Sequence, residues 1–247
     1  MPAISMRLGS LCLGLGLCAQ PAQADPGYYV NTPYAQAGQW GAELRYWTVK
    51  TRQGGPAVLW PELALSYGFG ERWTSTLLAS YQGTREEAMR LSTLNWLNQF
   101  RLDDGRGDWD FALHTQLIRG HAEAQGHALE VGLLSQTEWH LARIQANVSL
   151  EHGWGELARS GTELKYQWQL SWPLRPGWRA GMQGFGELGN WRDWKPAERQ
   201  SHRLGPAFQA RWTLREYQDL QLQAAYLFGK VYGRQAGMFS ATVKLLF

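Results

Sequence analysis

Apolar and polar residues alternate along most of this chain, and this period of two limits the folds that it can adopt. In LKYQWQLSWPL, residues 164–174, every second side chain from Leu164 to Trp172 is apolar, and Lys, Gln or Ser stands between them. Successive side chains of a β-strand point to opposite faces, so the segment predicts a strand with one apolar and one polar face. Such strands form either a sandwich around an apolar core or a barrel with its apolar face in lipid.

About twelve segments of roughly nine to thirteen residues share this pattern, and that is the length a tilted strand needs to cross a bilayer. No sheet edge can stay unpaired in hydrocarbon, so the sheet must close. The prediction is an all-β fold, an antiparallel transmembrane up-and-down β-barrel of about 12 strands over residues 40–247. The strands are expected at 40–48, 61–69, 73–81, 94–102, 109–117, 129–141, 143–151, 164–174, 178–189, 202–214, 220–228 and 237–247.

The segment 178–189 is less regular than the others, and its glycines indicate a bend or crowding against a neighbouring strand. We find no segment with the apolar stripe of an amphipathic helix and no linker between domains. One continuous barrel is therefore expected.

The first 24 residues have the pattern of an export signal. Arg7 precedes the apolar run LGSLCLGLGLCA, and a small-x-small site ends at Ala24. The apolar run has about a dozen residues, fewer than the ~20 that span a bilayer as a helix, so cleavage after Ala24 is expected. Both cysteines, Cys12 and Cys18, lie in this segment, which leaves the mature chain without disulfides or thiol chemistry. Residues 25–39 show no period and are expected to form an irregular, Tyr-rich leader.

Composition agrees with a barrel. The mean hydropathy of −0.41 resembles that of a soluble protein, but a membrane barrel exposes only one apolar face of each strand and has no long apolar run. The formal net charge of +3 is too small to indicate nucleic-acid binding. The 14 tryptophans are an excess that fits a membrane-interface belt.

The turns alternate in length, as in outer-membrane barrels with short periplasmic turns and longer outer loops. The expected short turns are 68–72, 103–108, 140–143, 174–177 and 214–219, and the longer, more charged loops are 51–57, 82–88, 119–127, 152–161, 190–200 and 229–237.

Large aromatic residues gather at the strand ends assigned to the periplasm, where amphipathic rings settle at the level of lipid headgroups. A sandwich would instead place large rings along the middles of its strands. The predicted girdle comprises Trp40, Trp73, Trp109, Trp139, Trp172, Trp178, Trp212 and Phe247.

The polar residues that alternate with the apolar ones should line the lumen with amides and with charges of both signs. Its interior could be a hydrogen-bonded network that only stabilises the barrel, or a water-lined path for a small solute. Arg45, Arg179, Arg203 and Arg211 are candidates for contact with an anionic or aromatic guest. The complete set of candidates is Glu43, Arg45, Glu62, Arg90, Glu138, Lys165, Arg179, Glu187, Arg203 and Arg211.

Catalytic and metal-binding patterns are weak. His140 lies near Glu138, and His152 lies near Ser149 and Glu151, but neither spacing defines a hydrolase triad. The pair His121 and His127 in one loop is typical of a solvated surface. No catalytic residue, metal or cofactor is predicted.

The export signal, the long alternating strands and the C-terminal strand ending in Phe247 resemble those of Gram-negative outer-membrane β-barrels. The step YGFGERW, residues 67–73, resembles the putative transporters of the phenol-degradation (MetA-type) group more loosely. The resemblance implies a passive or selective channel for an unidentified small solute. Its expected partners are outer-membrane lipid and the barrel-insertion machinery, which would recognise Phe247. The alternatives are a closed structural or accessory barrel and an outer-membrane hydrolase.

Overall fold

The chain forms a closed barrel of twelve antiparallel strands, as predicted. This computed structural model describes residues 29–34, 37–52, 54–121, 126–155, 161–231 and 233–247, so the expected export signal lies outside the described residues. The strands are β1 (Trp40–Thr51), β2 (Val58–Phe69), β3 (Trp73–Gln82), β4 (Arg90–Arg101), β5 (Trp109–Gly120), β6 (His127–Trp139), β7 (Ala142–Trp154), β8 (Thr162–Arg175), β9 (Trp178–Asn190), β10 (Ser201–Arg215), β11 (Gln218–Val231) and β12 (Arg234–Leu246).

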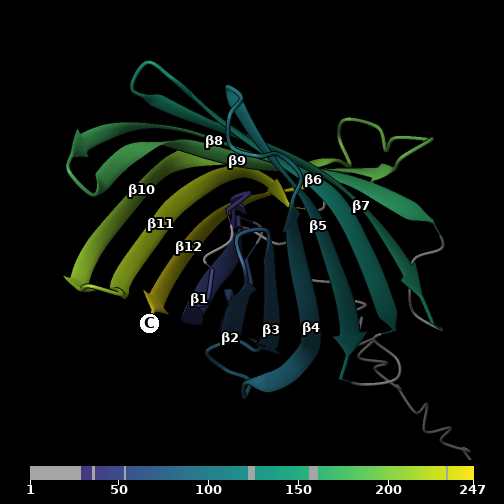
Figure 1. Ribbon diagram of the computed structural model, residues 1–247. Helices are drawn as coiled ribbons and strands as arrows, with labels where there is room; N and C mark the ends of the chain where they lie inside the picture. Colours follow the sequence, from purple (N-terminus) through teal and green to yellow (C-terminus); the bar gives the residue numbers. More distant parts are fainter. Residues whose placement is uncertain (1–28, 35–36, 53, 122–125, 156–160, 232) are drawn as a thin grey trace, which may run out of the picture.

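Pairing between the first and last strands closes the sheet. Each strand pairs with its neighbours in sequence, and β12 returns to lie beside β1 (Figure 1). The amide of Trp40 donates to the carbonyl of Phe247 at 2.8 Å, and the amide of Phe247 donates to the carbonyl of Trp40 at 3.0 Å. The apolar C-terminal strand therefore removes the edge that an open sheet would expose.

The period of two sorts side chains between the outer surface and the lumen. On β1 and β2, Leu44, Leu63 and Leu65 are exposed outward, whereas Glu62 points inward and is fully buried. An exposed apolar surface around a whole barrel suits lipid and not water. The described residues include no helix with the length and hydropathy to cross a bilayer.

The two ends of the barrel differ. Both termini of the barrel, Trp40 and Phe247, lie at the end that carries the turns 70–72, 102–108, 140–141, 176–177 and 216–217, which we call the short-turn end. The other end, the long-loop end, carries the connections 52–57, 83–89, 121–126, 155–161, 191–200 and 232–233. The expected long loop at 229–237 is wrong: Gly229 to Val231 pair with Arg234 to Ala236, and Gly233 at φ 77° fits the tight turn between them.

The irregular segment on β9 is crowded, as its glycines indicated. A Cβ on Gly184 would lie 2.5 Å from the Trp168 ring, and one on Gly186 would lie 2.0 Å from the Tyr166 ring. These two rings of β8 cover the glycines across the strand pair. The glycines therefore make room for large neighbours.

Candidate functional site in the barrel lumen

The inner wall of β9 to β1 carries two rows of polar side chains, which the strand register places side by side. In the row nearer the short-turn end, Arg211, Gln221, Lys244 and Glu43 are successive cross-strand neighbours. The next row runs from Arg179 through Gln209, Gln223 and Thr242 to Arg45. Directly opposite residues have Cβ atoms about 5 Å apart, so each row acts as one polar surface.

Glu43 and Arg45 form an ion pair within this wall. Nε of Arg45 lies 2.7 Å from Oε1 of Glu43, and both side chains are nearly buried. The guanidinium of Arg45 also lies over the ring of Tyr29, 5.1 Å from its centroid. Arg45 is thus the ion-pair partner of Glu43, and Lys244, its direct cross-strand neighbour, interacts with the same carboxylate from a longer distance.

A second group of charges lies on β6 to β10, toward the long-loop end. Nζ of Lys165 lies 3.3 Å from Glu130 and 2.5 Å from Glu151. Nη2 of Arg203 lies 2.5 Å from Oε1 of Glu187, and their side chains are 1% and 9% exposed. Buried charges of this kind persist only with such partners, so these pairs fix the barrel wall and are not free to bind a solute.

Four glutamines line the wall between these two charged regions. Gln136, Gln145, Gln169 and Gln183 are successive cross-strand neighbours on β6 to β9. Gln169 donates to Gln183 at 3.1 Å. Gln145 is 1% exposed, and neither polar atom of its amide has a hydrogen-bond partner in the described part of the chain.

An apolar cluster fills part of the lumen on the β1, β2 and β11 side. Trp47 and Trp60 stack inside the barrel, with ring centroids 4.7 Å apart and planes inclined by 13°. Leu227 and Met238 are completely or almost completely buried against them. The cluster contains Tyr29, Val30, Trp47, Val49, Trp60, Phe185, Ala207, Ala225, Leu227, Val231, Ala236 and Met238.

Residues 29–34 of the leader lie inside the lumen. Tyr29 and Val30 belong to the apolar cluster, while Asn31 accepts a hydrogen bond from Asn147 at 2.9 Å through its carbonyl. Tyr34 donates to Asp110 and accepts from Gln136 at 2.7 Å. We call residues 29–34 the inner segment. It runs from the apolar cluster toward the short-turn end and is held by polar side chains of the wall.

A cavity of about 1070 Å³ lies between the inner segment and the glutamine and cation rows. It reaches the short-turn end, where Pro176 and Gly177 of the β8–β9 turn line it. Its lining contains six cationic side chains and one carboxylate, that of Glu43. The cations are Arg45, Arg143, Arg175, Arg179, Arg211 and Lys244.

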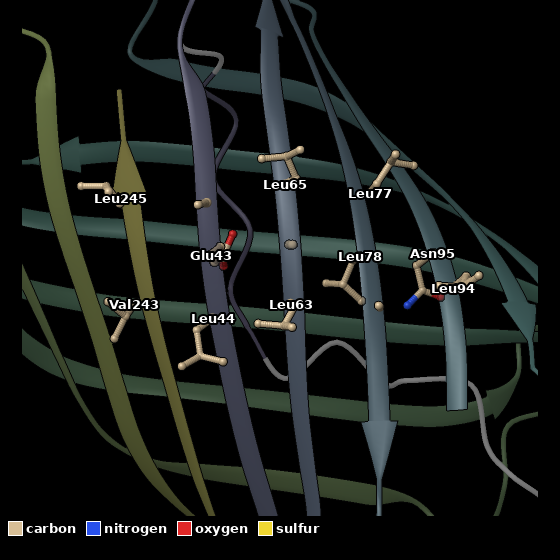
Figure 2. A pocket seen from close by; sticks show the side chains of 13 residues that line it. Glu43, Leu44, Leu63, Leu65, Leu77, Leu78, Leu94, Asn95, Val243 and Leu245 are labelled. Atoms are coloured by element: carbon tan, nitrogen blue, oxygen red, sulfur yellow. The ribbon is translucent and has the colours of Figure 1, made fainter. Parts of the chain in front are cut away.

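A second hollow lies on the outer surface and is entirely different in character. Its volume is about 680 Å³, and the branched side chains of Leu44, Leu63, Leu65 and Leu77 surround it on β1 to β3 (Figure 2). Ala42 and Ala79 line it with their small side chains. Two polar residues, Glu43 and Asn95, also line it, but most of its lining is leucine, alanine and valine, so the hollow suits hydrocarbon.

The lumen candidates fall into three groups. Glu43, Arg45, Glu62, Lys165, Glu187 and Arg203 are buried or nearly buried inside the barrel. Glu62 accepts a hydrogen bond from Ser80 at 2.8 Å. Arg179 lines the cavity and donates to backbone carbonyls. Arg90 is exposed at the long-loop end, and Glu138 and Arg211 are more than half exposed at the short-turn end.

The predicted girdle residues lie around the short-turn end. Rings are in contact from Trp40 through Tyr67 and Phe69 to Trp73, with successive centroids 4.8, 4.8 and 4.4 Å apart. Trp178 and Trp212 pack edge to face on the other side of the barrel. Trp109, Trp139, Trp172 and Phe247 are exposed at the same end.

Sequence reasoning missed the aromatic residues inside the lumen. Trp47 and Trp60 have the parity of Arg45 and Glu62, so carrying the alternation two residues further along β1 and β2 would have placed both inside. The inner segment gave no such signal, because its contacts join residues as far apart as Tyr34 and Gln136.

The structure places the two histidine groupings on a strand and at a turn. Ser149 and Glu151 share the inward parity of β7, whereas His152 is exposed on the outward parity, so strand geometry separates them. His140 occupies the tight β6–β7 turn at φ 54°. In the described part of the chain, no three His, Cys, Asp or Glu side chains converge on a point that could hold a metal.

No protein-family model and no curated protein matches the sequence. Several solved structures share the fold. An outer-membrane channel from Pseudomonas putida F1 superposes with a TM-score of 0.58 at 11% identity, covering 91% of this chain and 99% of that one. A NanC porin gives 0.57 at 9% identity, covering 82% and 98%. A KdgM porin solved in complex with disordered oligogalacturonate gives 0.52 at 7% identity, covering 82% and 97%.

Proposed function

We propose that this protein is a passive, selective channel of a Gram-negative outer membrane that admits a small polar solute. The observation that carries the proposal is the contrast between the two faces of the closed sheet. The outer face is an exposed apolar surface, and the lumen holds a cavity of about 1070 Å³ lined by cations and amides. In a purely structural barrel we would expect a packed lumen and no polar cavity that reaches one end.

The similar folds support this proposal. The NanC and KdgM porins and the Pseudomonas channel are outer-membrane pores, and this chain spans nearly their whole length. Their sequence identity to this chain is too low to infer which solute it would carry. The looser likeness of YGFGERW to MetA-type transporters agrees with uptake of a small molecule and adds no contact residue.

The proposed topology places the short-turn end in the periplasm. Export would remove residues 1–24, and the barrel-insertion machinery would engage the C-terminal strand through Phe247. Outer-membrane lipid would then contact the exposed apolar face, with the aromatic residues of the short-turn end at the inner headgroup level. Catalysis has no part in this proposal.

A closed structural or accessory barrel is the second candidate, and one observation favours it. The apolar cluster occupies the lumen between the cavity and the long-loop end, and the inner segment lies beside the cavity. The channel proposal therefore requires that the inner segment shift when solute passes. Its hydrogen bonds to Asn147, Gln136 and Asp110 are polar contacts that water can replace.

Single-channel recording in planar bilayers tests the proposal. We expect discrete current steps for the wild type, and larger or longer openings for a double variant, Tyr29→Ala with Val30→Ala, that weakens the packing of the inner segment. The exposed loop variant Trp191→Ala is the matched control. Correctly folded, heat-modifiable protein that passes no current in either form would establish the closed barrel instead.

A further inference from the structure

The cavity carries an excess of positive charge that the barrel itself does not neutralise. Arg45 is paired with Glu43, Arg143 with Glu138 and Arg211 with Asp219. The remaining lining cations, Arg175, Arg179 and Lys244, have no carboxylate within 4 Å among the described residues. Glu138 and Glu43 attract Arg179 and Lys244 from longer distances, but both carboxylates are already paired with other arginines. Field lines from three such charges concentrate in a low-dielectric cleft and attract anions.

Arg175 and Arg179 are nevertheless engaged. The guanidinium of Arg175 lies over the ring of Trp178, 3.7 Å from its centroid. Arg179 donates to the carbonyls of Leu141 and Ser171 at 3.0 and 2.9 Å. Lys244 differs from both. Its ammonium makes no hydrogen bond with the described residues and has no carboxylate among them within 4 Å, and Glu43 acts on it only from a longer distance.

The position of Lys244 is fixed by the packing of its stem. A Cβ on Gly41 would lie 3.0 Å from Cε of Lys244 and 2.4 Å from Oγ of Ser66, so the lysine stem packs over this glycine. Gly41 lies one inward position closer to the short-turn end than Glu43, the cross-strand neighbour of Lys244. The side chain therefore leans toward the end at which the cavity reaches the rim.

Polar groups surround this ammonium. Gln221 is its direct neighbour on β11, and Gln223 and Thr242 lie one row deeper. The buried hydroxyl of Thr242 has no hydrogen-bond partner in the described residues. The amides of Gln221 and Gln223 are half-buried and line the cavity. Across the cavity, the amide of Gln145 is also unpartnered and almost completely buried.

We propose that Lys244, Gln221, Gln223 and Thr242 form a binding site for a small carboxylate that carries hydroxyl groups, such as a sugar acid. The carboxylate would accept from the Lys244 ammonium, and charge-assisted bonds of this kind are the strongest available there. Amide and hydroxyl side chains both donate and accept, so they match the hydroxyl groups of the same solute. The inference rests on the proposed function, since it names the solute class that the channel selects.

The test measures binding apart from transport. Isothermal titration calorimetry on the detergent-solubilised barrel at low salt would use gluconate, with sorbitol as its uncharged counterpart. We expect gluconate to bind and Lys244→Gln to raise its Kd about tenfold, the loss typical of a hydrogen bond to a charged group. Lys244→Arg should remain within about threefold of the wild type by retaining the charge. Lys50→Gln, which removes an exposed lysine outside the cavity, is the matched control.

Reversal potentials in a KCl gradient separate this inference from the channel proposal. A current that prefers anions, and that loses the preference in Lys244→Gln but not in Lys50→Gln, supports both. Lys244-dependent gluconate binding without any current supports the site and rejects the channel. Current without gluconate binding, or equal gluconate affinity in Lys244→Gln and Lys50→Gln, rejects the site and leaves the channel in place.

Discussion

The hydroxyl of Tyr34 donates a hydrogen bond to Oδ2 of Asp110 at 2.5 Å, and this contact ties the inner segment to the wall of the barrel. Asp110 also accepts from Arg101 at 2.8 Å, so its carboxylate stays paired without the tyrosine. Gln136 donates to the same hydroxyl. One phenolic oxygen thus connects the leader to two strands.

Removing that oxygen should loosen the inner segment without disturbing the barrel. We expect Tyr34→Phe to increase the mean open time or conductance in planar bilayers, because both hydrogen bonds disappear while the ring remains. Tyr217→Phe, at an exposed turn tyrosine, is the control. Identical currents in Tyr34→Phe and Tyr217→Phe would contradict a restraining role for the contact.

The same contact should depend on pH only at strongly alkaline values. Burial, together with the hydrogen bond to Asp110, raises the pKa of Tyr34 above its ordinary value. A raised pKa in the folded state means that the stabilisation is complete below about pH 10, where unfolded tyrosine ionises, and is lost as the pH rises through the folded value. The ordinary pKa of tyrosine is about 10, so Tyr34 stays protonated between about pH 7 and pH 9. Ionisation of Tyr34 should therefore not change the wild-type currents in that range. A Tyr34-dependent change already within that range would count against the assignment.

The β4–β5 turn should respond to acid through Asp103. Burial alone would raise the pKa of this carboxyl, but hydrogen bonds from the backbone of Phe111, from Arg101 and from the backbone of Gly105 outweigh it and lower the pKa. The stabilisation is therefore complete above the unfolded value of about 4 and is lost as the pH falls through the lower folded value. NMR shifts of the Phe111 and Gly105 amides should follow this titration, and Asp103→Asn should abolish it. Shifts that titrate unchanged in Asp103→Asn would assign the transition to another group.

The Trp47–Trp60 stack should be a major source of stability inside the lumen. Trp60 is 4% exposed and belongs to the apolar cluster. Replacing a buried tryptophan by alanine typically costs about 3–5 kcal/mol, because a large cavity remains. Urea unfolding of Trp60→Ala in lipid or detergent should show such a loss, whereas exposed Trp191→Ala should stay within about 0.5 kcal/mol. A small effect at Trp60 would mean that the inner segment and its neighbours repack.

Removing one partner of the buried Arg203–Glu187 ion pair should destabilise the barrel more than removing both partners. Removing one partner leaves a buried charge unpaired and typically costs about 3–5 kcal/mol, whereas removing both is often nearly neutral. We expect Arg203→Met to lower the free energy of unfolding strongly and Glu187→Gln in the same chain to recover most of the loss. A double variant as unstable as the single one would show that Arg203 acts chiefly through its other neighbours.

Phe247 should contribute to closure and to assembly in separable ways. Deleting it removes both backbone hydrogen bonds to Trp40, whereas Phe247→Ala keeps the backbone and removes only the ring. If the insertion machinery recognises the aromatic ring, cells should contain less heat-modifiable barrel of Phe247→Ala than of the wild type. The purified Phe247→Ala variant should still refold normally into detergent. Phe247→Tyr should behave as the wild type in both assays. Equal cellular yields for all three forms would contradict recognition of the ring.

Local sequence determined the architecture of this protein because a strand has a fixed period of two. The alternation through Glu43 and Arg45 assigned them to one face, and the same rule put Leu44 on the other. Strand length and the aromatic residues at strand ends needed no tertiary information either. Even the pairing of β12 with β1 followed from the requirement that a sheet in lipid has no free edge.

Only the tertiary structure decided what each lumen residue does. Parity makes Arg203, Lys244 and Arg45 equivalent, but closure of the barrel pairs Arg203 with Glu187 and Arg45 with Glu43, and it leaves the ammonium of Lys244 facing the cavity. The inner segment is the clearest case, since Tyr34 has no period and finds Asp110 across 76 residues of chain. Contacts of this kind depend on register and curvature around the whole barrel, which no local pattern encodes.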